Sequence, residues 1–284
     1  MTRVTYANRR TVLTGLAGAA LSASVLNAFT VAPAYAADLY ASNTDLYIKL
    51  AGKEGTDFTR RYKRHEPFDN SNDQRGPVNR TTIMALHGGG VEGGTSELCL
   101  AIAGYHPATL AVSPAGGPVH DYWMFEGVRR SGNSDLHVPS TNNDDRAALS
   151  MAAGSLNVLS LHGCTGAQAG VPHDQPEAVV VGGLHTNFRT YLREEFQAAG
   201  FQTIDGSTVP ALAGEDPNNI CNKTLLGMGA QLEMTTELRQ SMFDPGYFSQ
   251  LERPTHTNGR FDAFVGAARK AIARLEAGTD QVVL

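Results

Sequence analysis

The sequence predicts an α/β fold built on an open, mainly parallel (mixed) sheet with helices on both faces. Short apolar runs typical of buried strands alternate with longer amphipathic stretches typical of helices, which is the pattern of successive β-α-β units. Two of the apolar runs end in a histidine followed by glycine, at Leu86-His87-Gly88 and at Leu161-His162-Gly163. Because binding sites in such folds lie at the carboxyl ends of the strands, both histidines are expected there.

The individual elements are expected between residues 82 and 277. Strands are expected at residues 82–86, 122–125, 156–161, 178–181 and 231–234. Helices are expected at residues 95–103, 144–153, 187–199 and 261–277, and Thr95 or Ser96 is expected to cap the first of them. Residues 52–80 are polar and rich in turn-forming residues, which predicts a surface excursion.

The first 36 residues predict an export signal of the twin-arginine type. The pair Arg9-Arg10 precedes a weakly hydrophobic stretch rich in glycine and alanine, and Ala34-Tyr35-Ala36 fits a cleavage site. An uncleaved membrane anchor is the alternative, but the glycines and serines make the stretch a poor transmembrane helix. Residues 37–284 are then expected to form a single domain, a secreted, extracellular monomer without a membrane span.

Charge and cysteine content exclude two classes of protein. Without the three leader arginines, 20 basic side chains face 28 acidic ones, a formal charge of −8, which argues against a nucleic-acid partner. Three cysteines are too few for a disulfide scaffold. A Cys164–Cys221 bridge is possible after export, whereas Cys99 lies in an apolar run and is expected to be buried.

The segment from His87 to Glu92 is a candidate metal site. Three consecutive glycines follow His87, and such a turn lets the chain fold back tightly so that both side chains reach one point. His162 repeats the arrangement of strand, histidine and glycine, and two histidines with one glutamate form a common catalytic zinc shell. The alternative is a glycine turn with a solvated glutamate and a hydrogen-bonded histidine.

A zinc-bound water needs a base, and Glu233 is the candidate. It is the one carboxylate in the apolar run Gln231-Leu232-Glu233-Met234. Burial beside a metal would tune such a group for proton transfer. A solvent-facing glutamate on an edge strand is the alternative interpretation.

These segments together resemble the poly-γ-glutamate hydrolase family, a bacterial and phage group related to zinc carboxypeptidases. The resemblance runs from about Thr56 to Arg239, and its most specific motif is His87-Gly88-Gly89-Gly90-Val91-Glu92. It also rests on residues 93–98, 125–127, 136–140, 161–164, 181–184, 219–222, 231–233 and 238–239. The resemblance implies a zinc-carboxypeptidase-like fold, one Zn²⁺ ion held by His87, Glu92 and His162, and Glu233 as the general base.

The resemblance also implies an anionic glutamate polymer or peptide as the substrate. Cationic or amide side chains should then bind its carboxylates, and His137, Asn222 and Arg239 are the candidates. Two other functions stay open: a zinc peptidase or amidase acting on cell-wall peptides or small acylated amino acids, and a secreted binding module without catalysis. A serine hydrolase is disfavoured because the sequence around Ser96 is not a nucleophile elbow.

Overall fold

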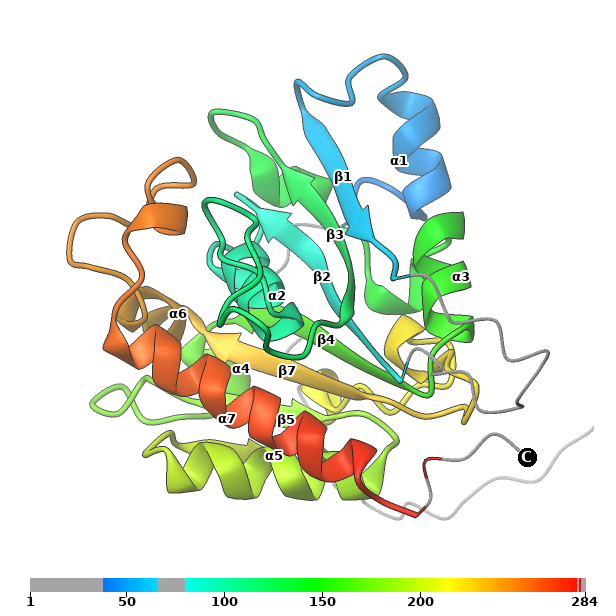
Figure 1. The fold of residues 1–284 in the computed structure, drawn as a ribbon. Coiled ribbons are helices and arrows are strands. Elements are labelled where there is room, and N and C mark those ends of the chain that lie inside the picture. Colours follow the sequence, from blue (N-terminus) through cyan, green and yellow to red (C-terminus); the bar gives the residue numbers. More distant parts are fainter. Residues whose placement is uncertain (1–37, 66–79, 280, 282–284) are drawn as a thin grey trace, which may run out of the picture. The chain divides into compact units, whose positions relative to one another are not determined.

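The computed structural model describes residues 38–65, 80–279 and 281 (Figure 1). The predicted export signal at residues 1–36 lies outside the described residues. Within the described ranges, no helix combines the length and the apolar character that crossing a bilayer requires.

A seven-stranded mixed sheet forms the centre of the domain, in the order β1-β3-β2-β4-β7-β5-β6 (Figure 1). Its strands are β1 (Phe58–Lys63), β2 (Thr81–Gly89), β3 (Asp121–Gly127), β4 (Asn157–Cys164), β5 (Val179–Gly182), β6 (Thr203–Asp205) and β7 (Ala230–Thr235). The four central strands β3, β2, β4 and β7 are parallel, while β1 and β5 run antiparallel to their neighbours β3 and β7. The mainly parallel sheet predicted from the sequence is therefore confirmed.

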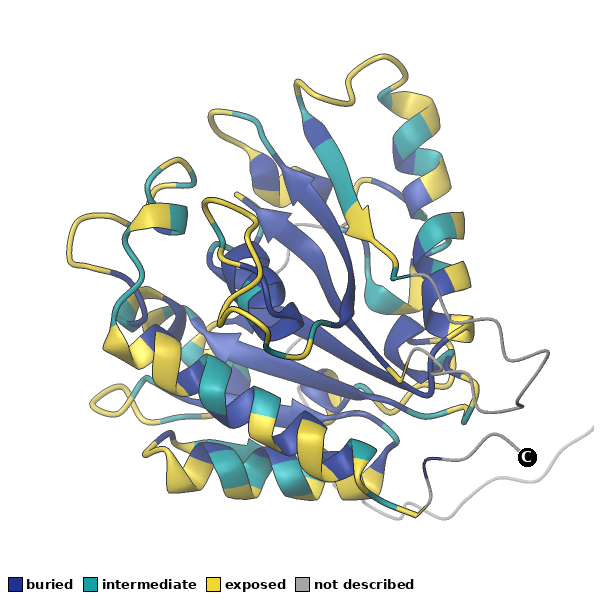
Figure 2. Cartoon of the chain, in the orientation of Figure 1, coloured by how far each residue is buried: buried dark blue, intermediate teal, exposed yellow. Residues whose placement is uncertain are grey.

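Helices cover both faces of this sheet. They are α1 (Asn43–Lys49), α2 (Thr95–Ala103), α3 (Arg146–Ala153), α4 (Gly166–Ala169), α5 (Thr186–Ala198), α6 (Thr236–Ser241) and α7 (Gly259–Glu276). Helices α2, α5 and α7 pack on one face through the larger apolar core, and α1 and α3 pack on the other face through a second core. The strands are buried throughout the centre, whereas the exposed residues lie on the outer sides of the helices and in the loops (Figure 2).

The two faces of the central strands differ in polarity. Successive side chains of a strand point to opposite faces, so Leu159 and Leu161 join the larger core while Ser160 and His162 point the other way. In the register of β4 and β7, His162 pairs with Glu233. The candidate base and one candidate ligand therefore lie side by side on the same face of the sheet.

The N-terminal part of the domain differs from its prediction. The surface excursion predicted for residues 52–80 is wrong at residues 58–63, which form the edge strand β1; residues 66–79 lie outside the described residues. Phe58 is buried in the core, but the other side chains of β1 are partly or fully exposed. An edge strand of this kind has a polar composition, so it resembles a loop in the sequence.

Two smaller expectations are also corrected. The expected cap of α2 by Thr95 or Ser96 is absent: Gly94, with φ +100°, precedes the helix, and no side chain caps it. The Ser96 hydroxyl instead accepts a hydrogen bond from the Gly89 N–H at 2.9 Å. All three cysteines are free, buried thiols. Cys164 and Cys221 do not pair because they belong to two separate clusters of the core.

Candidate metal and catalytic site

The glycine turn after β2 is packed so closely that it admits no side chain. A β-carbon on Gly88 would lie 2.3 Å from the Ser96 hydroxyl oxygen, and one on Gly89, where φ is +65°, would lie 2.4 Å from the Gly127 carbonyl oxygen. The Glu92 N–H donates to the His87 carbonyl at 2.8 Å and closes the turn. The glycines therefore allow the turn to pass between its neighbours and bring Glu92 back beside His87.

A bulge in β2 directs the His87 ring. Between Ala85 and Gly88, β2 contains one residue more than the facing stretch of β3. Such a bulge breaks the regular alternation of side chains along a strand. The ring of His87 thus comes to lie beside that of His162, with the ring centroids 5.0 Å apart.

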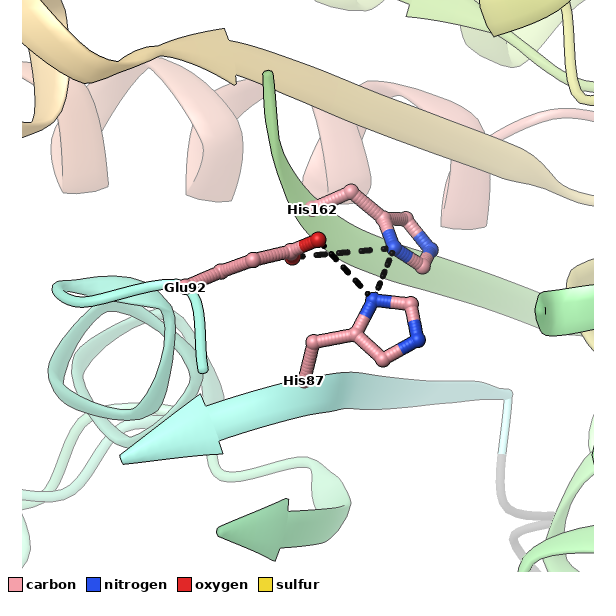
Figure 3. Close-up of side chains that lie close together, drawn as sticks. All are labelled: His87, Glu92 and His162. Atoms are coloured by element: carbon pink, nitrogen blue, oxygen red, sulfur yellow. Dashed lines mark hydrogen bonds and ion pairs between the residues drawn. The ribbon is translucent and has the colours of Figure 1, made fainter. Parts of the chain in front are cut away.

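Three side chains converge on one point at the ends of β2 and β4 (Figure 3). The Nδ1 atom of His87 lies 3.0 Å from Oε1 of Glu92 and 3.2 Å from Nδ1 of His162, which lies 3.9 Å from Oε2 of Glu92. The ligand atoms of a tetrahedral zinc ion lie about 3.4 Å apart when the bonds to the metal are about 2.1 Å long. The spacing and the chemistry of these three groups fit a zinc ion.

Other contacts orient each of the three ligands. The Val138 carbonyl accepts a hydrogen bond from Nε2 of His87 at 2.8 Å, which leaves Nδ1 of a neutral ring as the ligand atom. The Gly163 N–H donates to Oε2 of Glu92 at 2.8 Å, and Nε2 of His162 lies 3.3 Å from the Ser140 hydroxyl oxygen. The ligands are held in place by the protein itself, as metal ligands generally are.

The protonation of two of these groups suits a cation. Burial opposes a charge on His87, but the Glu92 carboxylate raises the pKa of this ring, so His87 would release a proton when a metal binds. Burial opposes ionisation of Glu92, but the neighbouring His87 holds its pKa at about 2. Burial and His87 lower the pKa of His162 to about 3, so its imidazole is neutral at pH 7. An ionised carboxylate and a neutral imidazole are the forms that bind a metal.

Glu233 lies next to this cluster on β7. Its side chain is buried, and the Gln231 amide donates to its Oε1 at 3.1 Å. Burial and the Glu92 carboxylate raise the pKa of Glu233 well above its usual range. A carboxyl group in this environment keeps its proton to a higher pH than an exposed one and is suited to proton transfer.

The three residues expected to bind substrate occupy different environments. The Asn222 amide accepts hydrogen bonds from Leu184 and Gly229 and donates to the carbonyls of Gly214 and Asp216, so these backbone contacts use both its oxygen and its nitrogen. The amide holds these loops together, and its contact with substrate stays a prediction.

Arg239 is also engaged by the backbone. Its guanidinium donates to the carbonyls of Gly93 and Met234 and packs against Gly163. His137, in contrast, lies at the site itself: its ring centroid is 4.0 Å from that of His87, and its Nδ1 lies 2.8 Å from a carboxylate oxygen of Asp38.

Arg253 supports the glycine turn and was not predicted. It is buried, it donates to the Gly89 carbonyl at 2.7 Å and to the Phe248 carbonyl at 2.9 Å, and it forms an ion pair with Glu97 at 3.2 Å. Arg253 and Arg239 therefore hold carbonyls at the two ends of the segment from Gly89 to Gly93. Nothing in the sequence around Arg253 indicates this role, because two of its partners are main-chain carbonyls and the third, Glu97, is distant in the sequence.

Comparisons with known proteins agree with this geometry. Residues 56–267 match the poly-gamma-glutamate hydrolase family. The UPF0714 protein YndL of Bacillus subtilis (strain 168) is 33% identical over 210 residues, which cover 72% of this chain and 74% of that protein. A bacteriophage poly-gamma-glutamate hydrolase structure superposes with a TM-score of 0.67 at 26% identity, covering 84% of this chain and 98% of that chain. A zinc-free apo structure of YndL covers the same shares, with a TM-score of 0.66 at 29% identity.

Proposed function

The chain belongs to the poly-γ-glutamate hydrolase family, and we propose from this that it is a secreted zinc-dependent hydrolase that cleaves the γ-glutamyl amide bonds of poly-γ-glutamate. The observation that carries the proposal is the convergence of two imidazoles and one carboxylate, with the buried Glu233 on the adjacent strand. The zinc-free form described for the related YndL also supports zinc as the metal.

In the proposed reaction, a zinc ion held by His87, Glu92 and His162 would supply a Lewis acid for the hydrolysis. Glu233 accepts a proton from the water whose oxygen attacks the amide carbonyl. The same carboxyl group then delivers the proton to the leaving nitrogen when the amide bond breaks. The products are a new carboxylate and a new amine.

The burial of Glu233 suits both steps. Its high pKa makes it a better base than an exposed carboxylate, and the Gln231 amide fixes the orientation of its carboxyl group. A bound cation would stabilise the ionised form, which is the form that must accept the proton.

The substrate and the location are further parts of the proposal. A γ-linked glutamate polymer carries one free carboxylate on each unit, and the acidic net charge of the chain would not attract it. Attraction must therefore come from the metal and from donors close to it. Export by the predicted twin-arginine signal would bring the enzyme to an extracellular polymer, and N-terminal sequencing of secreted protein should then begin at residue 37.

Metal content and substrate can be tested on one set of samples. Purified protein should contain about one equivalent of zinc, and His87→Ala should contain little; equal contents would refute the ligand assignment. The zinc-loaded protein should release glutamate oligomers from poly-γ-glutamate and nothing from peptidoglycan fragments. Release from peptidoglycan alone would instead identify a cell-wall peptidase, and zinc binding without any turnover would identify a binding module.

A further inference from the structure

A carboxylate of the chain itself is bound at the edge of the metal site. The Asp38 side chain lies 2.8 Å from Nδ1 of His137, whose ring is 4.0 Å, centroid to centroid, from that of the candidate ligand His87. We propose that His137 forms a subsite for a substrate carboxylate, and that Asp38 occupies this subsite and competes with the substrate. This inference rests on the proposed function, because it assumes a substrate rich in carboxylates.

The contacts of the other candidates single out His137. The Asn222 amide uses its oxygen and its nitrogen on backbone groups, and the Arg239 guanidinium donates to the carbonyls of Gly93 and Met234. Of the three side chains expected to bind the polymer, His137 is the one that contacts a carboxylate. The bound Asp38 also shows that the space beside His137 admits a carboxylate at hydrogen-bonding distance.

The attachment of Asp38 suits a group that can be displaced. Residues 38–42 form neither helix nor strand, and about one third of the Asp38 side chain is exposed. Tyr40 is buried in the core and Ser42 donates to Asp144 at 2.8 Å, so the chain is anchored from Tyr40 onward. Moving Asp38 away from His137 therefore leaves this anchor in place.

Asp38 precedes the stretch of the chain that matches the family. That match covers residues 56–267 and includes His137. A carboxylate at position 38 adds negative charge beside His137 and the candidate ligand His87, where an anionic polymer must bind.

Steady-state kinetics on poly-γ-glutamate tests the inference with the zinc-loaded protein. Asp38→Ala should lower KM by about three- to tenfold, the effect of one hydrogen bond to a charged group, with kcat unchanged. His137→Ala should raise KM, and Asp38→Ala should have no further effect when His137 is absent. Asp45→Asn is the matched control: it removes the same charge from the same N-terminal region, and Asp45 contacts Lys49 instead of His137. Its KM should equal that of the wild type.

Two results would overturn the inference. A fall in kcat in Asp38→Ala would mean that Asp38 orients His137 for catalysis, and an equal KM effect in the presence and absence of His137 would exclude a shared subsite. Calorimetric titration with glutarate separates this inference from the proposed function, because it needs no turnover. Glutarate should bind more tightly to Asp38→Ala than to wild type, and this gain should disappear in Asp38→Ala/His137→Ala. That result would support the subsite even if the wild-type protein left the polymer intact. Equal binding to wild type and Asp38→Ala would reject the subsite.

Discussion

Replacing Arg253 by methionine should destabilise the domain strongly, because the substitution leaves a buried carboxylate without its partner. The side chains of Arg253 and Glu97 are 3% and 5% exposed, and Nε of Arg253 lies 3.2 Å from Oε2 of Glu97. Removing one partner of a buried ion pair costs about 3–5 kcal/mol. The carbonyls of Gly89 and Phe248 also lose their donors, so we expect the free energy of unfolding to fall by at least this amount.

The double substitution identifies the cause of this loss. Glu97→Gln removes the charge that Arg253→Met would leave unpaired. The fall in the free energy of unfolding of the double variant should therefore be at least about 1 kcal/mol smaller than the sum of the falls in the two single variants. Urea unfolding, followed by the fluorescence of the single tryptophan Trp123 and carried out in EDTA, would measure all four proteins without a contribution from metal.

The destabilisation caused by Arg253→Met should also depend on pH. Burial already raises the pKa of Glu97 above its usual 4.5, and the loss of Arg253 should raise it further. A carboxyl group with a raised pKa in the folded state contributes stability below its unfolded pKa and loses it as the pH rises through the folded value. The loss of stability in the variant should therefore be smaller near pH 4.5 than at pH 8, while the carbonyls of Gly89 and Phe248 lack their donors at both pH values. Losses that are additive and independent of pH would refute the role of this ion pair.

Three further predictions concern the site and its surroundings. Glu233→Gln should lower kcat by about 10²- to 10⁴-fold while zinc content stays at the wild-type level, and a loss of zinc would instead make Glu233 a ligand. Gly163→Ala should weaken zinc binding in competition with a chelator, because a β-carbon there would lie 2.5 Å from the Arg239 guanidinium carbon and disturb the N–H that holds Glu92. Burial lowers the pKa of His120 to about 4, so wild type should lose about 3 kcal/mol of stability between pH 6.5 and pH 4, and His120→Gln should lose less in urea titrations over this range.

The sequence was sufficient for the central sheet because its strands are buried on both sides. Residues 82–86 and 156–161 are mostly apolar, and the strands β2 and β4 cover both predictions except for residue 156. Strand β1 was missed because an edge strand needs apolar side chains at few positions, and Phe58 alone did not distinguish it from a loop. Periodicity identified α5 and α7 because these helices are long enough for their apolar residues to recur at helical spacing, whereas α1 has only seven residues.

The convergence of the three candidate ligands could be predicted because residue type and local spacing carried the information. His87 and Glu92 are linked by a short turn, and His162 lies near the end of a strand that pairs with β2, so the three side chains come together as expected. Their role as ligands stays a prediction. The contacts of Arg253 and Asp38 depend on partners more than 90 residues away in the sequence. Such contacts depend on the tertiary structure, and no local sequence pattern predicts them.

The crowding of the glycine turn restricts how this enzyme can change. Side chains cannot be added at Gly88 or Gly89 without displacing neighbouring strands, and the hydroxyl of Ser96 already fills the space beneath them. Variation in the length or chemistry of the proposed polymer substrate would then have to arise in segments that border the candidate metal site without forming it, such as residues 38 and 39. A directed-evolution library aimed at new substrates should therefore be confined to that border.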